Sequence, residues 1–262
     1  MKTKKIILLL LVCVLALPTF ASCRKRKAGE LTPTDTSSDS YVIRTSIDLF
    51  CDDEVMGDFF DNLENDRSVI YVDGNKIKAE RTYEVEVSGK HVRKDTYVIA
   101  DGVIYDYYRY YMNDILQSSE TAKSNITSDE VSGLLNGFCF IGGISEEGFS
   151  EIQEESLEDK DVTTYSEPDA KNRIVFERMV ISLLEGYCDL VTLRSATLTV
   201  TETEVGYSDA IALCSFDVTI GGEVYTLSAT VRLNFDYSER FDVSLPSDSD
   251  KYEEVEINDI ID

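Results

Sequence analysis

The chain lacks most of the residues from which catalytic sites are built. Its 262 residues include one histidine, His91, and no tryptophan. A serine or cysteine nucleophile that is activated by histidine would have to use that one side chain. Its place beside Ser88-Gly89-Lys90, a turn signal, is typical of a solvent-facing histidine. No GxSxG nucleophile elbow and no phosphate-binding glycine loop occur. We therefore expect no enzymatic activity and no cofactor.

A metal site is not indicated either. No two cysteines have CxxC spacing, which argues against zinc. No acidic segment has the Asp/Asn loop with a glycine and a terminal glutamate that binds calcium. Beyond the N-terminal segment the cysteines are Cys51, Cys139, Cys188 and Cys214. In an exported protein these would permit two disulfides, but thiols in the apolar phase of strands are often free and buried, which we favour here.

Basic residues are scarce relative to acidic ones. The chain has 25 Lys and Arg against 50 Asp and Glu, a net charge of −25. Such a surface repels nucleic acid, so we exclude DNA and RNA as partners. It would also hold a tethered domain away from an anionic membrane. The acidic excess is best understood as a solubility feature.

The N-terminal segment has the form of a secretory signal. Three lysines within the first five residues precede an apolar run, Ile6–Phe20, and the small residues Ala21-Ser22 follow it. The run is shorter than the ~20 apolar residues that a membrane-spanning helix needs. A signal peptide over residues 1–22 is therefore favoured over a retained anchor.

Residues 20–23, Phe-Ala-Ser-Cys, resemble the bacterial lipobox, with phenylalanine where that motif usually has leucine. In lipobox proteins the cysteine thiol receives a diacylglycerol and the chain is cut in front of it. The resemblance implies an extracytoplasmic protein that is held to the bacterial cell membrane by fatty chains, such as palmitate, on Cys23. Plain secretion is the main alternative. Residues 23–40 would then be the lipidated cysteine and a polar linker, which has nothing to bury.

Alternating apolar and polar residues predict a meander of strands in the first half of the folded part. Strands are expected over 43–51, 69–72, 77–87, 91–100 and 103–111, with Asp73-Gly74 and Asp101-Gly102 as turns. A second meander is expected over 196–200, 212–220 and 225–235, with a short final strand over 241–245. The acidic residues 247–262 are expected to be frayed.

Helices are expected between the two meanders. Thr127-Ser128-Asp129-Glu130 has the capping-box form, and apolar residues follow at helical spacing to Phe138. Residues 146–161 hold eight acids and one lysine, and are expected to be a solvated segment. Ser166-Glu167-Pro168 is expected to begin a second helix that extends to Leu184.

Long strands with one apolar face must bury that face against another layer, and two helices are too few to cover two separate sheets. The pattern therefore predicts one α+β domain over residues 41–246. In it a large curved antiparallel sheet, a half-barrel, would have a few helices on its concave face. This plan resembles the LolA/LppX-like lipoprotein fold, most closely at residues 100–105, 233–238 and 243–246. The resemblance implies an apolar ligand, such as a lipid, held between the sheet and the helices.

Two groups of residues are candidates for binding. The strand positions that would line such an apolar cavity, or form a packed core if there is no cavity, are Tyr83, Val85, Phe216, Val218, Leu227 and Val231. The second group comes from the tyrosine-rich residues 105–111. There Tyr105, Tyr107 and Tyr111 share one strand face, while Tyr108 and Tyr110 share the other.

One face of this tyrosine segment could line a pocket, and Tyr108 and Tyr110 could contact a protein partner. The alternative is that tyrosine is simply favoured in strands. The sequence thus predicts a non-catalytic, membrane-anchored extracytoplasmic lipoprotein that binds or carries an apolar ligand. The alternative is an interaction or scaffold module for another envelope protein.

Overall fold

The computed structural model describes residues 40–53, 56–57, 60, 67–86, 89–184, 187–238 and 242–261. The strands of the first half are β1 (Ser40–Cys51), β2 (Arg67–Asp73), β3 (Lys76–Glu86), β4 (Lys90–Ala100), β5 (Val103–Met112) and β6 (Ile115–Asn125). The remaining strands are β7 (Phe149–Ser156), β8 (Asp161–Pro168), β9 (Leu190–Thr203), β10 (Gly206–Ile220), β11 (Glu223–Asp236) and β12 (Glu253–Glu254). Three helices are described in full: α3 (Ser128–Phe138), α4 (Ala170–Leu183) and α5 (Asn258–Ile261).

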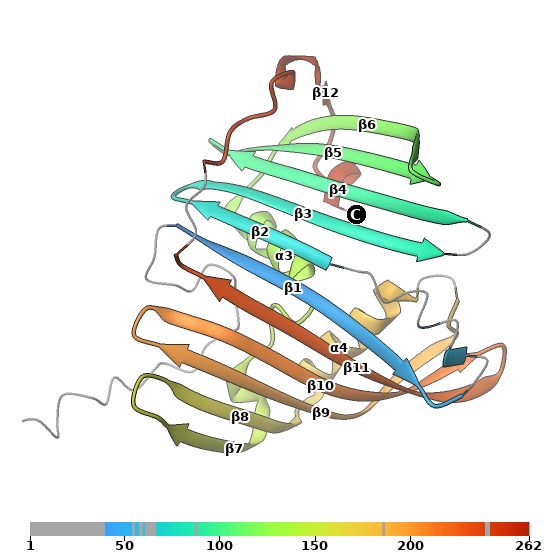
Figure 1. The fold of residues 1–262 in the computed structure, drawn as a ribbon, viewed down its shortest axis with the longest axis vertical. Helices are drawn as coiled ribbons and strands as arrows, with labels where there is room; N and C mark the ends of the chain where they lie inside the picture. Colours follow the sequence, from blue (N-terminus) through green and yellow to red (C-terminus); the bar gives the residue numbers. More distant parts are fainter. Residues whose placement is uncertain are drawn as a thin grey trace, which may run out of the picture.

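All described strands belong to one curved, open sheet with the order β12-β6-β5-β4-β3-β2-β1-β11-β10-β9-β8-β7 (Figure 1). Strands β1 to β6 form one antiparallel meander and β7 to β11 form another. The two meanders meet where β1 pairs with β11, with Ile47 opposite Val231. The predicted α+β class and the large curved antiparallel sheet are therefore confirmed.

Strand alternation gives the sheet two different faces. In β1 and β10 every second residue is buried, because the apolar residues point to the side that carries the helices. We call this side the helix face and the opposite side the open face. In Figure 1 helices α3 and α4 lie behind the strands, so the open face is toward the viewer.

Both expected helices are present, but one begins later than predicted. Thr127 and Glu130 form the predicted capping box of α3, and the Thr127 backbone N–H donates to Glu130 Oε2 at 2.7 Å. Helix α4 is capped instead by Asp169, whose carboxylate accepts the backbone N–H of Asn172 at 2.9 Å. The prediction that Ser166 begins this helix was wrong, because Ser166 pairs with Glu151 and Thr197 in the sheet.

The core lies between the helix face and the two helices. Phe176, Val180 and Leu184 of the α4 segment are 0% exposed and belong to the same cluster as Leu198 of β9. At the other end, Phe138 of α3 packs edge-on against Tyr97 of β4, with ring centroids 5.5 Å apart. The helices thus cover this side of the sheet mainly at β2 and β3 and at β8 and β9.

Besides the two-residue β12, three strands lie where the sequence pattern predicted none. β7 is almost wholly exposed, β6 is exposed over its first half and half-buried over its second, and β8 has few apolar positions, so none of the three shows a clear apolar alternation. They form because β5, β8 and β9 offer backbone partners. The segment 146–161, predicted to be solvated, is exposed from Ser150 onward, where it forms most of the edge strand β7. Its beginning is not solvated, because Glu146, Gly148 and Phe149 are buried.

The C-terminal segment is ordered, and the prediction that it is frayed was wrong. β12 pairs in parallel with β6, and the buried Tyr252 packs its ring against Tyr105 at 6.0 Å. The chain then turns around the sheet edge, since Val255, Ile257 and Ile260 pack against the core on the helix face. No strand forms over the described residues 242–246, and Phe241 lies outside the described residues.

Candidate functional site

Four of the six residues predicted to line an apolar cavity belong to the packed core. Phe216, Val218, Leu227 and Val231 are 0% exposed. Tyr83 is half-buried against the same core. The side chain of Val85 lies outside the described residues. The structure thus brings the first four together in the core.

The predicted anchor at Cys23, the signal peptide and most of the linker lie outside the described residues. Within the described part of the chain, no helix is both long enough and apolar enough to cross a bilayer.

Tyr108 and Tyr110 lie on the helix face of β5, on the part of the strand beyond α3. The Tyr110 hydroxyl is 2.6 Å from Nδ1 of His91, and the two rings stack. The guanidinium of Arg93 lies 5.3 Å from the centre of the Tyr108 ring. Both tyrosines are half-buried, so their rings are largely engaged within the molecule.

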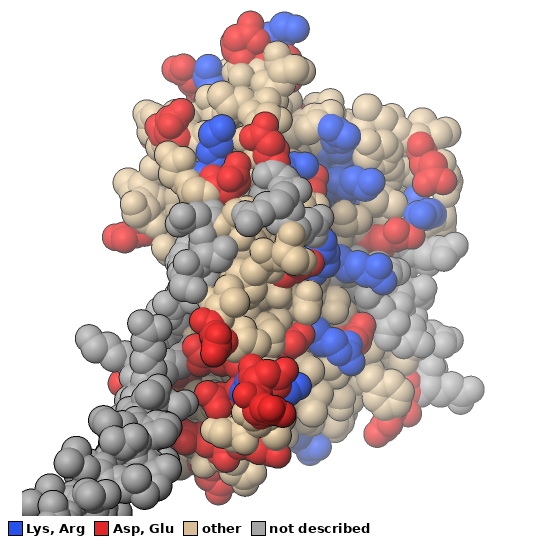
Figure 2. All heavy atoms as spheres, turned by 60° about the vertical axis from the view of Figure 1, so that its left-hand side comes forward, with Lys and Arg blue, Asp and Glu red and all other residues tan. Residues whose placement is uncertain are grey.

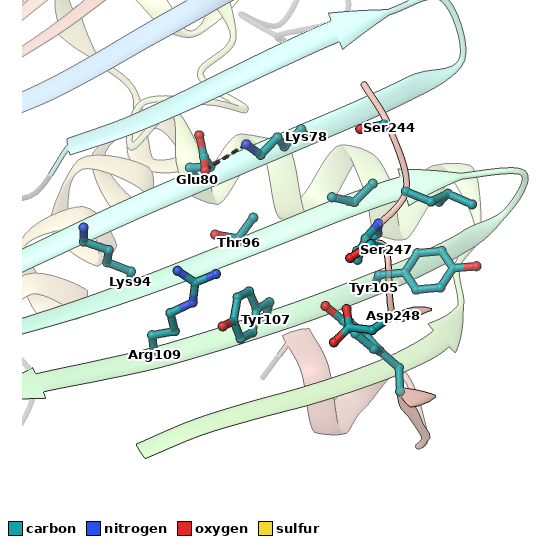
Figure 3. A pocket seen from close by; sticks show the side chains of 14 residues that line it. Lys78, Glu80, Lys94, Thr96, Tyr105, Tyr107, Arg109, Ser244, Ser247 and Asp248 are labelled. Carbon is teal, nitrogen blue, oxygen red and sulfur yellow. Dashed lines mark ion pairs between the residues drawn. The ribbon is translucent and has the colours of Figure 1, made fainter. Parts of the chain in front are cut away.

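The other tyrosine face lines a hollow on the open face. This hollow has a volume of about 470 Å³. Its floor comes from three neighbouring strands, with Lys78 on β3, Lys94 and Thr96 on β4, and Tyr105 and Tyr107 on β5. In the sheet register Thr96 is opposite Tyr107, which places these side chains on the same face. Figure 3 shows them directed to the side that α3 does not cover.

The C-terminal segment forms one wall of this hollow. Ser244, Ser247 and Asp248 line it, and in Figure 3 their segment crosses in front of the strands. The ring of Tyr252 closes the same side against Tyr105. Residues far apart in the sequence therefore meet here. Hydroxyl groups and one carboxylate face the cationic floor.

Two cations in the hollow have aromatic partners instead of acidic ones. The Arg109 guanidinium lies 3.8 Å from the centre of the Tyr107 ring, and the Lys94 ammonium lies 5.7 Å from that of Tyr111. Among the described residues neither forms an ion pair, whereas Lys78 pairs with Glu80 at 3.0 Å. The Arg109 Nε atom is buried and forms no hydrogen bond within the described chain. Both cations can therefore attract an anionic group.

A second hollow of about 420 Å³ adjoins the first. The two share Glu80, Lys94 and Thr96, so they form one continuous depression, which we call the open-face groove. Arg67 and Thr82 line its far part. The groove thus runs across β2 to β5 and beneath the C-terminal segment.

The charge around the groove differs from that of the whole chain. By strand alternation the open face of β2 to β6 carries the basic residues Arg67, Lys76, Lys78, Lys90, Lys94, Arg109 and Lys123. The described acidic residues in the same phase are Asp73, Glu80 and Glu84. Most blue side chains in Figure 2 lie in the upper half of the view, the half that β2 to β6 form in Figure 1. A basic face on a chain of net charge −25 is a local reversal of sign.

A second polar cluster lies on the helix face of β4 and β5. Arg93 Nε donates to both carboxylate oxygens of Asp95, at 3.2 and 3.0 Å. Burial raises the pKa of Asp106 to about 7, and the nearby Asp95 adds to the rise. Burial also raises the pKa of Tyr97, the cross-strand neighbour of Asp106. The Asp106 Oδ1 atom is buried without a hydrogen bond from the described chain. Asp106 can therefore titrate near neutral pH.

The cysteines offer no reactive thiol among the described residues. Cys51, Cys139, Cys188 and Cys214 are all free. Burial raises the pKa of Cys139 and of Cys214 to about 12, so both stay protonated at neutral pH. Of the two alternatives left open by the sequence, the structure shows free thiols.

Sequence reasoning missed the groove, although part of its signal was present. The polar phase of β3 and the tyrosine phase of β5 are both visible as alternation around Lys78 and Tyr107. Nothing in the sequence placed the C-terminal segment over them. In the comparisons with known proteins, no family model matches the chain, and no curated protein matches it in a sequence search.

Proposed function

We propose that the protein is a non-catalytic, extracytoplasmic bacterial lipoprotein that binds an anionic ligand in the open-face groove. The observation that carries this proposal is the pair Lys94 and Arg109. Both cations line a hollow, and neither is neutralised by a described acidic side chain. Cations that are positioned by aromatic rings and have no acidic partner suit the recognition of carboxylate, sulfate or phosphate groups.

An apolar ligand between helices and sheet is the function that the half-barrel resemblance suggests. On the helix face Phe216 and Val231 are 0% exposed, and Phe176 fills the space between α4 and the sheet. A lipid would have to displace these contacts, each large apolar side chain contributing about 1.5–3 kcal/mol. The open-face groove needs no such displacement, so we favour it as the binding site.

The anionic-ligand proposal is tested with purified protein and three labelled polyanions: dextran sulfate, polyphosphate and poly-L-glutamate. At least one should bind at low salt, and its affinity should fall steeply as salt rises. The double variant Lys94→Gln/Arg109→Gln should weaken this binding at least tenfold, whereas Arg178→Gln, on the exposed side of α4, should not. No binding by any polyanion, or equal loss in the control, would overturn the proposal.

The lipid anchor on Cys23 is tested separately on the native product. Mass spectrometry should find an N-terminal Cys23 that carries acyl mass, and Cys23→Ser should release the protein from membranes. A product that begins upstream of Cys23 would contradict the anchor without affecting the groove.

A second candidate function is an interaction module for another envelope protein, and the edge strand β7 favours it. Seven of its eight residues are exposed, and its outer backbone edge has no described partner strand. A photo-crosslinker at the exposed Ile152 should capture one specific envelope protein. The same crosslinker at the exposed Leu213, in the sheet interior, is the control.

A further inference from the structure

We infer that the ligand of the open-face groove is a linear acidic glycan, with Lys94 and Arg109 on its acid groups and the tyrosines against its sugar rings. This inference rests on the proposed function and names its ligand class. Four observations carry it: the shape of the groove, the mixed charge of its lining, its aromatic floor and its hydroxyl-bearing wall.

The shape favours a chain over a small ion. Each hollow is within the range of pockets that hold whole small molecules, and the three shared residues make the two hollows continuous. Arg67 borders one end and the Tyr105–Tyr252 ring pair borders the other. A single sulfate or carboxylate would leave most of this depression unfilled.

The charge pattern favours a ligand that has both acid groups and neutral hydroxyl groups, because the cross-strand partners Lys94 and Arg109 share the groove with carboxylates. Glu80 lies where the two hollows meet, and Glu84 and Asp248 lie in their outer parts. These carboxylates would repel a polyanion that has no neutral polar groups between its charges. They can accept hydrogen bonds from sugar hydroxyls, while Lys94 and Arg109 attract the acid groups. An acidic glycan has both kinds of group.

The aromatic residues give the groove surfaces on which a sugar ring can lie. Tyr105 and Tyr107 stand next to the unpaired Arg109, and their rings are held in place by Tyr252 and by the guanidinium. A tyrosine combines an apolar ring with a polar hydroxyl, which suits a ligand with both apolar ring faces and hydroxyl groups.

The wall formed by the C-terminal segment adds short polar groups. Ser244 and Ser247 face the floor residue Thr96 across the hollow. Their hydroxyls can donate and accept hydrogen bonds.

The test is isothermal titration of the purified protein with galacturonate oligomers of increasing length, dextran sulfate, neutral dextran, polyphosphate and poly-L-glutamate. We expect galacturonate affinity to rise with length until the groove is filled, and at least one acidic glycan to bind at least tenfold more tightly than polyphosphate or poly-L-glutamate. Neutral dextran should not bind.

Two variants assign the binding to the groove. Lys94→Gln should lower the affinity for acidic glycans at least fivefold. Tyr107→Leu should lower the affinity for acidic glycans by a larger factor than the affinity for polyphosphate. The controls are Arg178→Gln and Tyr187→Leu, both exposed and outside the groove. Unchanged thermal unfolding of Lys94→Gln, whose side chain is exposed, keeps the result interpretable.

The outcomes separate the two proposals. Polyphosphate and poly-L-glutamate binding as tightly as the glycans would overturn the glycan inference and leave the anionic-ligand function standing. Neutral dextran binding equally well would also overturn the glycan inference, because it assigns the acid groups to Lys94 and Arg109. No binding by any polyanion would overturn both.

Discussion

The substitution Asp106→Asn should stabilise the protein in a pH-dependent manner. Burial and Asp95 raise the pKa of the Asp106 carboxyl from 3.8 to about 7 in the folded state. In the unfolded chain the Asp106 carboxyl loses its proton at a lower pH than in the folded protein. Between about pH 4 and pH 7 the folded state therefore binds one proton more than the unfolded state. The stability contributed by this group is therefore fully present below pH 4 and is lost as the pH rises to about 7.

The magnitude follows from the pKa difference. A change from 3.8 to about 7 corresponds to about 4 kcal/mol at about 1.4 kcal/mol per pH unit. Water reaches part of this half-buried side chain, so we expect a loss of about 2–4 kcal/mol. Asparagine has nearly the same shape and does not ionise, so the variant avoids the loss.

Guanidinium denaturation at pH 4.5 and pH 8.5 measures the effect. The two proteins should differ little at pH 4.5, whereas at pH 8.5 the Asp106→Asn variant should be more stable by about 2–4 kcal/mol. Asp161→Asn, an exposed change on β8, is the control and should leave the pH dependence unaltered. A difference between variant and wild type that is the same at both pH values would refute the reasoning.

Three further substitutions test the fold. Thr127→Ala removes the capping box of α3 and should lower the free energy of unfolding by about 1 kcal/mol in urea denaturation. Phe216→Ala should cost about 3–5 kcal/mol by the same measurement, since the ring is 0% exposed; a much smaller loss would indicate a cavity beside it and would revive the apolar-ligand proposal. Gly142→Ala would place a Cβ atom 2.4 Å from Asn136 Cα, a backbone clash that should lower the melting temperature in calorimetry by several degrees.

The sheet could largely be predicted because buried strands carry their own signal. Ile77 and Ala79, or Phe216 and Val218, show the alternation that one covered face imposes. β6 and β7 could not be found in this way. No residue of β6 is fully buried and seven of the eight residues of β7 are exposed, so backbone pairing with β5 and β8 defines them more than their side chains do.

The groove was harder to predict than the sheet. Tyr105 and Tyr107 were correctly placed on one strand face, but their neighbours Lys94 and Ser247 come from other segments, and only the register and the path of the C-terminal chain bring them together. The capping residue Asp169 was also missed, because Ser166 and Pro168 resemble a helix start by themselves. Local pattern identifies the elements, and long-range pairing builds the site.

The β1–β11 pair has a consequence for how the molecule reaches its final form. Arg232 and Asp48 form an ion pair across this seam although they are 184 positions apart. The seam cannot close until almost the entire polypeptide is available, and contacts at such separation form slowly. A newly made chain therefore stays without its complete sheet during synthesis, which suits the export that we propose for this protein.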